Sequence, residues 1–239
     1  MDYQERTYRN RISTSGLVSF TVHVKETDLL ISCDADHSQQ AFQSVCNHRG
    51  YIESYIRNHP DFLTSLSPLP DDQLAPPIIR DMLKATQAAE VGPMASVAGA
   101  ISEYVALDLL GISRNIVIEN GGDIYAKAEK DIQVGIFAGN SPLTFKVGLL
   151  LKVSQMPLGV CTSSGTVGHS FSFGRADAVC VVSKSATMAD AAATSIGNRI
   201  TGKDDIRTAL AEGMKIPDVL GVLIIVGERL GAVGDIELI

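Results

Sequence analysis

Strand-like and helix-like patterns follow one another in blocks along this chain, rather than in strict alternation. Two apolar runs at residues 17–24 and 29–33 flank the polar turn KETD, which predicts a β-hairpin. Over residues 35–58 the apolar positions recur at helical spacing until Pro60 ends the run, which predicts one long amphipathic helix. Because grouped strands and grouped helices recur further on, the pattern favours an α+β fold.

The rest of the chain extends this pattern and predicts a single domain over residues 1–239. An N-terminal hairpin and helix occupy about residues 1–60, and the proline-rich residues 61–77 are expected to form a connection without regular structure. The β-branched run at residues 116–118 predicts a strand that is buried on both faces. Further helices are expected at residues 78–90, 95–110, 188–199 and 204–212, and further strands at residues 115–119, 124–128, 132–137, 145–153, 178–182, 221–226 and 236–238.

Composition excludes several classes of partner. The net charge is −7 and the basic residues are scattered, so neither nucleic acid nor an anionic membrane surface is an expected partner. No run reaches the roughly 18 apolar residues of a membrane span, and residues 1–11 lack the apolar core of a secretory signal, which predicts a cytoplasmic protein. The four cysteines lack the spacing of a zinc site and are expected to be reduced. Apolar strands and small-residue helices permit a homodimer.

A glycine- and hydroxyl-rich segment, TSSGTVGHS at residues 162–170, is a candidate anion-binding site. Its hydroxyl groups are side-chain donors, and its glycines allow the turns by which successive backbone N–H groups converge on an anion. A diphosphate or a phosphomonoester would suit such a site, although the same residue types also form ordinary turns. The residues concerned are Thr162, Ser163, Ser164, Gly165 and Thr166.

A metal site is indicated by Asp190 and Thr194, which lie four residues apart in the segment ADAAAT and would share one face of a helix. Oxygen ligands favour a hard cation, and Mg²⁺ is commonly held by one or two carboxylates together with ligand phosphates. The alternative is a capping box, in which Thr187 and Asp190 satisfy backbone donors at the start of the helix.

Other residues near these segments could contribute to the same site. His169 follows the hydroxyl groups, and imidazole titrates close to neutral pH, which suits a general acid or base. Cys161 precedes them and is either a small buried residue at a strand end, the favoured interpretation, or a reactive thiol. Gly121 and Gly122 interrupt an upstream strand and could bring a second stretch of backbone close to the same ligand.

The order of three segments, ENGGDIY, then TSSGT with a nearby histidine, then ADAAAT, resembles the ApbE superfamily. Founding members of that superfamily are magnesium-dependent flavin transferases, which use FAD to place FMN on protein threonines. The resemblance covers roughly residues 92–198 and implies an ApbE-like fold, with a mixed and largely antiparallel sheet packed with helices. It also implies a phosphorylated small-molecule ligand, with Mg²⁺ and FAD or FMN as cofactors.

The resemblance implies a role for each motif. Asp190 and Thr194 match side-chain metal ligands, and Ala98 matches a helix position that donates its backbone carbonyl. His169 matches the histidine that follows the hydroxyl groups, which makes it the candidate catalytic residue. The implied cofactor-binding positions are Gly121, Gly122, Asp123, Thr162, Ser163, Ser164, Gly165 and Thr166.

The chain also departs from the transferase pattern. After the histidine the transferases usually have Asp-Pro and Thr-Gly elements, where this chain has SFSFGRAD, and Gly99 replaces a lysine of the alanine-rich helix. The chain looks more like the short cytoplasmic branch of the superfamily, and any activity is expected to be a transferase reaction related to that of FAD:protein FMN transferase. Two hypotheses result: a magnesium-dependent flavin or nucleotide-diphosphate site, or a non-transferase accessory factor in sulfide-dependent homocysteine biosynthesis.

Overall fold

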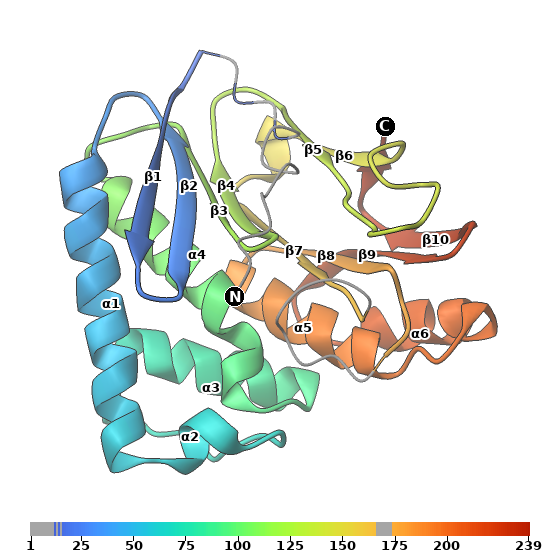
Figure 1. The fold of residues 1–239 in the computed structure, drawn as a ribbon, viewed down its shortest axis with the longest axis horizontal. Helices are drawn as coiled ribbons and strands as arrows, with labels where there is room; N and C mark the ends of the chain where they lie inside the picture. Colours follow the sequence, from blue (N-terminus) through green and yellow to red (C-terminus); the bar gives the residue numbers. More distant parts are fainter. Residues whose placement is uncertain (1–11, 13, 15, 166–173) are drawn as a thin grey trace.

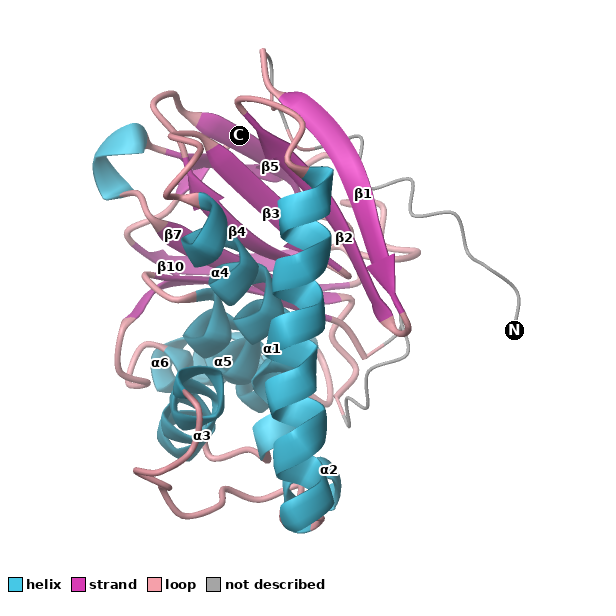
Figure 2. Cartoon of the chain, turned by 90° about the vertical axis from the view of Figure 1, so that its left-hand side faces the viewer, coloured by secondary structure: helices cyan, strands magenta, loops and turns pink. Residues whose placement is uncertain are grey.

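The computed structural model describes residues 12, 14, 16–165 and 174–239. At its centre is an eight-stranded sheet, with helices packed on one face and a three-stranded sheet packed on the other (Figure 1). Figure 2, turned by 90°, shows the helices gathered into one layer beside the strands. The predicted α+β class, with an antiparallel sheet and helices packed against it, is confirmed.

The large sheet has the order β1-β2-β3-β4-β7-β8-β9-β10, and every neighbouring pair in it is antiparallel. Because strands that follow one another in the chain mostly lie side by side, short connections are enough to build this sheet. Its strands are β1 (Val18–Val24), β2 (Thr27–Cys33), β3 (Ile116–Asn120), β4 (Asp123–Lys127), β7 (Leu158–Ser163), β8 (Ala178–Ser183), β9 (Val219–Val226) and β10 (Arg229–Gly234). The small sheet contains β11 (Glu237–Leu238), β6 (Gly148–Leu151) and β5 (Ile132–Gly135), in that order.

The helices cover one face of the large sheet, and α4 and α5 lie nearest its centre (Figure 1). The α-helices of the described residues are α1 (Ser38–Asn58), α2 (Asp61–Thr64), α3 (Pro77–Ala89), α4 (Val97–Leu109), α5 (Ala186–Asn198) and α6 (Ile206–Gly213). Short 3₁₀ segments are η2 (Pro93–Ser96), η3 (Val153–Gln155) and η4 (Lys203–Asp205). Within the described residues, no helix combines the length and the apolar character needed to cross a membrane.

The structure differs from the sequence-based expectation in several places, and one of them is strand β7, which has no counterpart among the expected strands. The connection at residues 61–77 contains the short helix α2, because the buried side chain of Phe62 anchors one helical turn. The strand expected at residues 145–153 is reduced to β6, because a turn that contains Phe145, with a φ angle of 56°, precedes it and η3 follows it. Strand β10 has no counterpart among the predictions, because its six residues are largely exposed and include two glycines, so no apolar alternation marks it.

Side-chain alternation along β3 separates two apolar cores. Ile116 and Ile118 pack with the helices, whereas Val117 packs with the small sheet. All residues of β3 are buried, which confirms the predicted burial on both faces. The same alternation in the neighbouring strands decides which of their side chains can meet α4 and α5.

Asp34 fastens the end of β2 to the segment that leads into β3. Its Oδ2 accepts hydrogen bonds from Ser113 Oγ at 3.0 Å and from the backbone N–H of Arg114 at 2.7 Å. Its Oδ1 accepts one from Asn115 Nδ2 at 2.8 Å. These hydrogen bonds, that of the Asn115 side chain above all, lower the pKa of Asp34 to about 2, so the ionised carboxylate closes this connection.

We expect the Asp34→Asn variant to be less stable than the native chain at neutral pH and less sensitive to acid. Because the folded pKa lies below the unfolded value, the stabilisation is present at neutral pH and is lost as the pH falls from about 4 to about 2. Urea unfolding over this range measures both effects, and Asp204→Asn, at an exposed position, is the control. The same acid sensitivity in Asp34→Asn as in the native chain would contradict this account.

Candidate functional site

Three side chains form a row across β3, β4 and β7, which we call the polar row. Asn120 lies opposite Asp123, and Asp123 lies opposite Cys161, in the antiparallel register. All three are buried, with exposed fractions of 7%, 8% and 0% respectively. Cys161 belongs to the core beneath the helices, and side chains paired directly across strands share one face, so Asp123 and Asn120 also point towards the helices.

The polar row begins at a two-residue hairpin. Gly121 and Gly122 have φ angles of 68° and 106°, which lie in the left-handed region that glycine adopts at no steric cost. The N–H of Gly122 donates to Glu119 Oε1 at 2.8 Å. The glycine pair therefore sets the register that places Asp123 opposite Asn120, and a direct role of this backbone in ligand binding stays a prediction.

The first turns of α4 and α5 meet at the polar row. Asp190 Oδ2 accepts a hydrogen bond from the backbone N–H of Gly99 at 2.9 Å, and the backbone of Ala98 also hydrogen-bonds this carboxyl group. The carbonyl of Ala98 accepts a hydrogen bond from Asn120 Nδ2 at 3.1 Å. Two of the predicted metal ligands, Asp190 and Ala98, are thus brought together with Asn120 in one hydrogen-bonded group.

The alternative role of Asp190, a capping box at the start of its own helix, does not match the geometry. The start of α5 is satisfied by Ser185 Oγ, which accepts from the N–H of Met188 at 3.3 Å, and by Glu103 Oε2, which accepts from the N–H of Thr187 at 2.9 Å. Asp190 instead caps the start of the neighbouring helix α4.

Two glycines allow α5 to approach its neighbours closely. A Cβ on Gly99 would lie 2.2 Å from the carbonyl oxygen of Ala186 and 2.8 Å from Cβ of Asp190. On the opposite side, a Cβ on Gly159 of β7 would lie 2.3 Å from Cα of Ala186. The transferase pattern has a lysine at this position. Its Cβ would overlap the same atoms of Ala186 and Asp190, so the close packing of α4 against α5 explains why this chain has glycine there.

The carboxyl groups of Asp123 and Asp190 lie in an environment that opposes their ionisation. Burial raises the pKa of Asp190 to about 7 despite its backbone donors. Burial, followed by the negative charge of Asp190, raises the pKa of Asp123 well above its usual range. Among the described residues no Lys, Arg or His forms an ion pair with either group. Burial and mutual repulsion therefore disfavour the state in which both carboxyl groups are ionised, and a shared proton or a bound cation would relieve that repulsion.

The burial and the hydrogen bond of Cys161 indicate a structural role for this residue. Its Sγ is fully buried and lies 3.3 Å from the carbonyl oxygen of Ala186, to which it donates. Burial, and then the charge of Asp123, raises the pKa of this thiol well above its ordinary value. Because the thiolate is the reactive form, the interpretation of Cys161 as a small buried residue at a strand agrees with this geometry.

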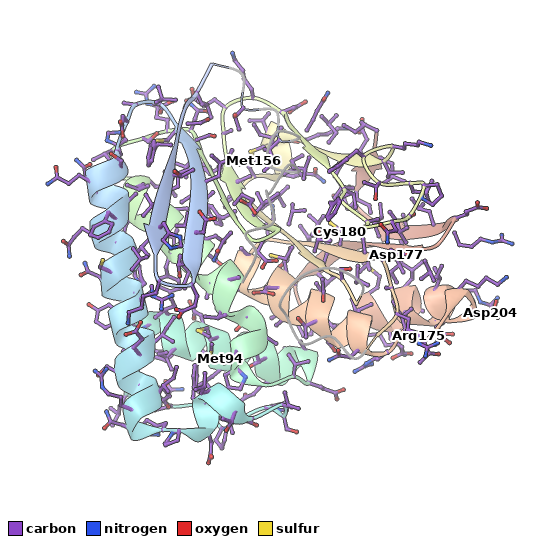
Figure 3. All side chains as sticks on the ribbon, in the orientation of Figure 1. Met94, Met156, Arg175, Asp177, Cys180 and Asp204 are labelled. Atoms are coloured by element: carbon purple, nitrogen blue, oxygen red, sulfur yellow. The ribbon has the colours of Figure 1, made fainter. Side chains whose placement is uncertain are left out.

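The first hydroxyl groups of the segment 162–170 belong to strand β7 rather than to a loop. Alternation puts Ser163 on the same face as Cys161, towards the helices. Thr162 faces the other core, where it hydrogen-bonds Cys180 across the strand pair; Cys180 is labelled in Figure 3. Of these two residues only Ser163 has its side chain on the face of the polar row.

The remaining predicted residues lie beyond the polar row along the chain, and two of them are outside the described residues. Gly165 donates its N–H to the carbonyl of Ala176 at 2.9 Å, and Ser164 is half-buried beside it. Thr194 is half-buried one turn beyond Asp190 on α5. Thr166 and His169 lie outside the described residues.

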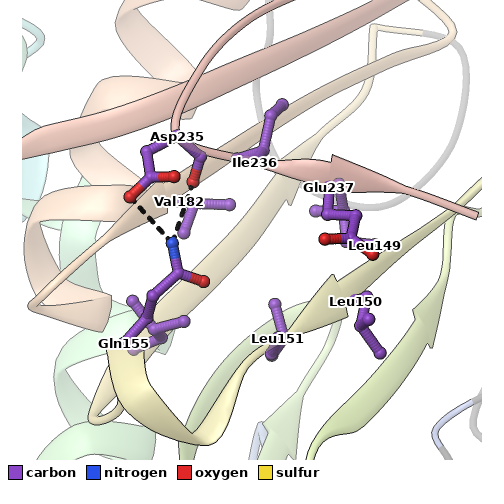
Figure 4. Close-up of a pocket in the computed structure, with 9 residues that line it drawn as sticks. Leu149, Leu150, Leu151, Gln155, Val182, Asp235, Ile236 and Glu237 are labelled. Carbon is purple, nitrogen blue, oxygen red and sulfur yellow. Dashed lines mark hydrogen bonds between the residues drawn. The ribbon is translucent and has the colours of Figure 1, made fainter.

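Two cavities of the described residues lie away from the polar row. One, of about 10 Å³, lies between β6 and β11, where Gln155 Nε2 donates to Asp235 Oδ2 at 2.8 Å (Figure 4). Its volume is at the lower limit for a single water molecule. The other, of about 210 Å³, lies on the face of β1, β2 and β3 that is opposite the helices, and its polar lining residues are Thr14, Ser19, Ser32 and Glu119.

Asn120 and Glu103 are functional candidates that were not named as site residues from the sequence, although Asn120 lies within the motif ENGGDIY. Asn120 directly precedes the glycine pair, so the pairing rule for two-residue hairpins could have placed it opposite Asp123. Glu103 has no such signal, because its partners Ser185 and Thr187 lie more than eighty positions along the chain.

We expect Gly99→Ala to destabilise the protein by about 1–3 kcal/mol, because the new methyl group would overlap the backbone of α5. Gly50→Ala on α1 is the matched control, since nothing lies within 4 Å of the added Cβ there. Its helix propensity should leave stability unchanged or raise it by up to about 1 kcal/mol. Urea unfolding compares the two variants, and equal stability would show that α4 and α5 are not closely packed at Gly99.

Comparisons with known proteins agree with this architecture. Residues 9–231 match the family described as AbpE bacteria. A UPF0280 protein of Methanococcus aeolicus is 43% identical over 221 residues, which cover 90% of this chain and 89% of the relative. A UPF0280 protein of Methanothermobacter thermautotrophicus is 49% identical over 198 residues, which cover 80% of this chain and 76% of the relative.

Solved structures show the same fold at low identity. The apo form of the flavinyl transferase ApbE from Pseudomonas stutzeri has a TM-score of 0.61 at 12% identity, covering 91% of this chain and 94% of that chain. A mutant of the flavin transferase ApbE from Vibrio cholerae has a TM-score of 0.59 at 12% identity, covering 90% of this chain and 97% of that chain. The expected ApbE-like fold is confirmed, and the chain belongs to the family described as AbpE bacteria.

Proposed function

We propose that this protein binds Mg²⁺ together with a flavin nucleotide, FAD or FMN, or a related nucleotide diphosphate. The observation that carries the proposal is the pair formed by Asp123 and Asp190. These two carboxyl groups lie close enough to repel each other, and no cationic side chain of the described residues pairs with either. The carbonyl of Ala98 is bonded into the same group through Asn120.

The residues present fit a hard cation. Carboxylate, carbonyl and hydroxyl oxygens are the ligands that Mg²⁺ prefers, and Asp123, Asp190, Ala98 and Thr194 would supply them. The described residues contain no group of three or more His, Cys, Asp or Glu side chains suited to hold a metal alone. Ligand phosphates and water would therefore complete the coordination, which is usual for Mg²⁺. A bound cation would also offset the repulsion between the two carboxylates.

The hydrogen bond from Asn120 to the Ala98 carbonyl affects how a cation could use that oxygen as a ligand. A carbonyl oxygen has two lone pairs, and Ala98 lies in the first turn of α4, where carbonyls also accept the helical hydrogen bond. A cation that uses this oxygen must share it with Asn120 or displace its amide. Asn120 thus belongs to the proposed site although it carries no charge.

The diphosphate would be held by donors at the end of β7. Ser163 lies on the face of the polar row, and Ser164, Gly165 and Thr166 continue the chain from it. The side chain of Thr162 faces the other core, and its backbone hydrogen-bonds the carboxyl group of Asp123, so Thr162 would act on the site through Asp123. The net charge of −7 opposes an anionic ligand, and Mg²⁺ between carboxylates and phosphates would offset that repulsion.

The solved neighbours support a flavin as the ligand, since they are flavin transferases. In this chain His169 would be the acid or base of any transfer step. The packing around Gly99 leaves no room for the lysine of the transferase pattern. Flavin binding, rather than flavin transfer, is therefore the proposed function.

The alternative, an accessory role in sulfide-dependent homocysteine biosynthesis, gains no support from the described residues. Cys161 is the thiol near the site that could have handled sulfide, and it is buried with a raised pKa. The cytoplasmic location and the homodimer that the sequence permits stay predictions.

Purified protein should bind FAD in the presence of Mg²⁺ and lose most of that affinity when EDTA removes the metal. Asp190→Asn and Asp123→Asn should each weaken FAD binding by about tenfold or more. Flavin fluorescence titration measures the affinity. Since burial favours the neutral form of Asp123, the isosteric asparagine is expected to preserve the fold at that position.

Asp204→Asn, at an exposed position far from the polar row in sequence, is the control and should bind FAD like the native chain. Native protein that binds no FAD with Mg²⁺ present would contradict the proposed function. Unchanged affinity in both Asp190→Asn and Asp123→Asn would contradict the proposed site.

A further inference from the structure

Glu103 lies one helical turn beyond Gly99 on α4 and reaches across to the start of α5. Its Oε2 accepts hydrogen bonds from Ser185 Oγ at 2.8 Å, from the N–H of Thr187 at 2.9 Å and from Thr187 Oγ1 at 2.9 Å. Three donors on one carboxylate oxygen make Glu103 a cap of α5, and a negative charge at a helix start is favoured by the helix dipole.

The two helices therefore cap each other. Asp190 on α5 accepts the N–H of Gly99 at the start of α4, while Glu103 on α4 accepts the N–H of Thr187 at the start of α5. Each helix supplies an acceptor that the other needs, because the first N–H groups of a helix have no partner within it. A shift of α5 along α4 would break both contacts at once.

Glu103 also acts on the sheet beneath the helices. Burial, and after it the negative charge of Glu103, raises the pKa of Tyr125 to about 12. Tyr125 follows Asp123 by two residues on the same face of β4. Glu103 is thus close to the polar row, although the structure records no hydrogen bond between it and Asp123, Asp190 or Ala98 within the described residues.

We propose that Glu103 is a positioning residue, which fixes α5 on α4 and so holds Asp190 beside Asp123 and the carbonyl of Ala98. It acts through Thr187 and the first turn of α5, not by touching a ligand. The effect on cation binding rests on the proposed function, whereas the effect on the position of Asp190 does not.

Amide hydrogen exchange in the metal-free, full-length protein tests the structural part. Glu103→Ala should speed exchange at Thr187, which loses its acceptor, and also at Gly99, whose acceptor Asp190 is no longer held in place. Glu103→Gln keeps an oxygen acceptor without the charge and should show the same changes to a smaller extent. Rates are compared with those of buried amides of β8, which report global opening. Exchange that rises at Thr187 but not at Gly99 would make Glu103 a local cap and overturn the inference.

Calorimetric titration with Mg²⁺ tests the consequence. Glu103→Gln should bind Mg²⁺ about tenfold more weakly than the native chain, as is typical when a partner behind a metal ligand is lost. Faster exchange at Gly99 with unchanged Mg²⁺ affinity would also overturn the inference. Native protein that binds no Mg²⁺ would contradict the proposed function, and exchange at Gly99 would then decide by itself whether Glu103 holds Asp190 in place.

Asp108→Asn is the matched control, because Asp108 is the other carboxylate of α4 that joins a second helix. It accepts hydrogen bonds from Ser44 Oγ at 2.6 Å and lies 2.9 Å from His48 Nε2, both on α1. Asp108→Asn should lower stability without changing the relative exchange at Gly99 or the Mg²⁺ affinity. A change in Mg²⁺ affinity equal to that of Glu103→Gln would show that general loosening of α4 is enough, which would overturn the specific role of Glu103.

Discussion

The hydrogen bond from the N–H of Gly99 to Asp190 is the contact on which the centre of this molecule depends. It joins two helices through residues that lie 91 positions apart in the chain. It also gives an acceptor to the N–H of Gly99, which has no partner within α4 because it lies at the start of that helix. Because Gly99 has no side chain, the two helix starts lie close enough for this contact to form. Both helices therefore pack over the polar row.

This arrangement gives Asp190 two roles that oppose each other. As a cap of α4 it is stabilised by backbone donors, while beside Asp123 it is a second acid in a space that disfavours charge. A buried charge without a partner destabilises a fold, usually by several kcal/mol. If Asp190 served only as a cap of α4, replacing Asp123 by a neutral residue would therefore make the protein more stable. The proposed cation would reconcile the two roles, because it would let both carboxylates ionise and would give the pair a function.

Much of the fold could be predicted from the sequence, because local patterns specify it. The hairpin expected at residues 17–24 and 29–33 is formed by β1 and β2, and the long helix expected at residues 35–58 is α1, which begins at Ser38. Asp190 and Ala98, which the resemblance assigns to one metal site, also lie together in the structure, while their role as metal ligands stays a prediction.

The rest depends on contacts between distant parts of the chain. Whether Thr162 or Ser163 faces the polar row depends on where β7 begins, and a shift of one residue would exchange the two faces. The cap that Glu103 provides to α5 depends on how two helices pack, which no local pattern of residues encodes. The exact ends of the strands and the packing of the helices are therefore the features of the site that could not be predicted from the sequence.

The most direct test of the account is the position of a bound metal ion. Crystals of the protein grown with FAD and Mn²⁺ in place of Mg²⁺ allow the metal to be located by its anomalous scattering, without reference to the protein's own atoms. The account predicts one strong peak within about 2.0–2.6 Å of a carboxylate oxygen of Asp190, close to Asp123 as well. A peak elsewhere on the molecule, with Asp190 still bonded only to the backbone of α4, would contradict it.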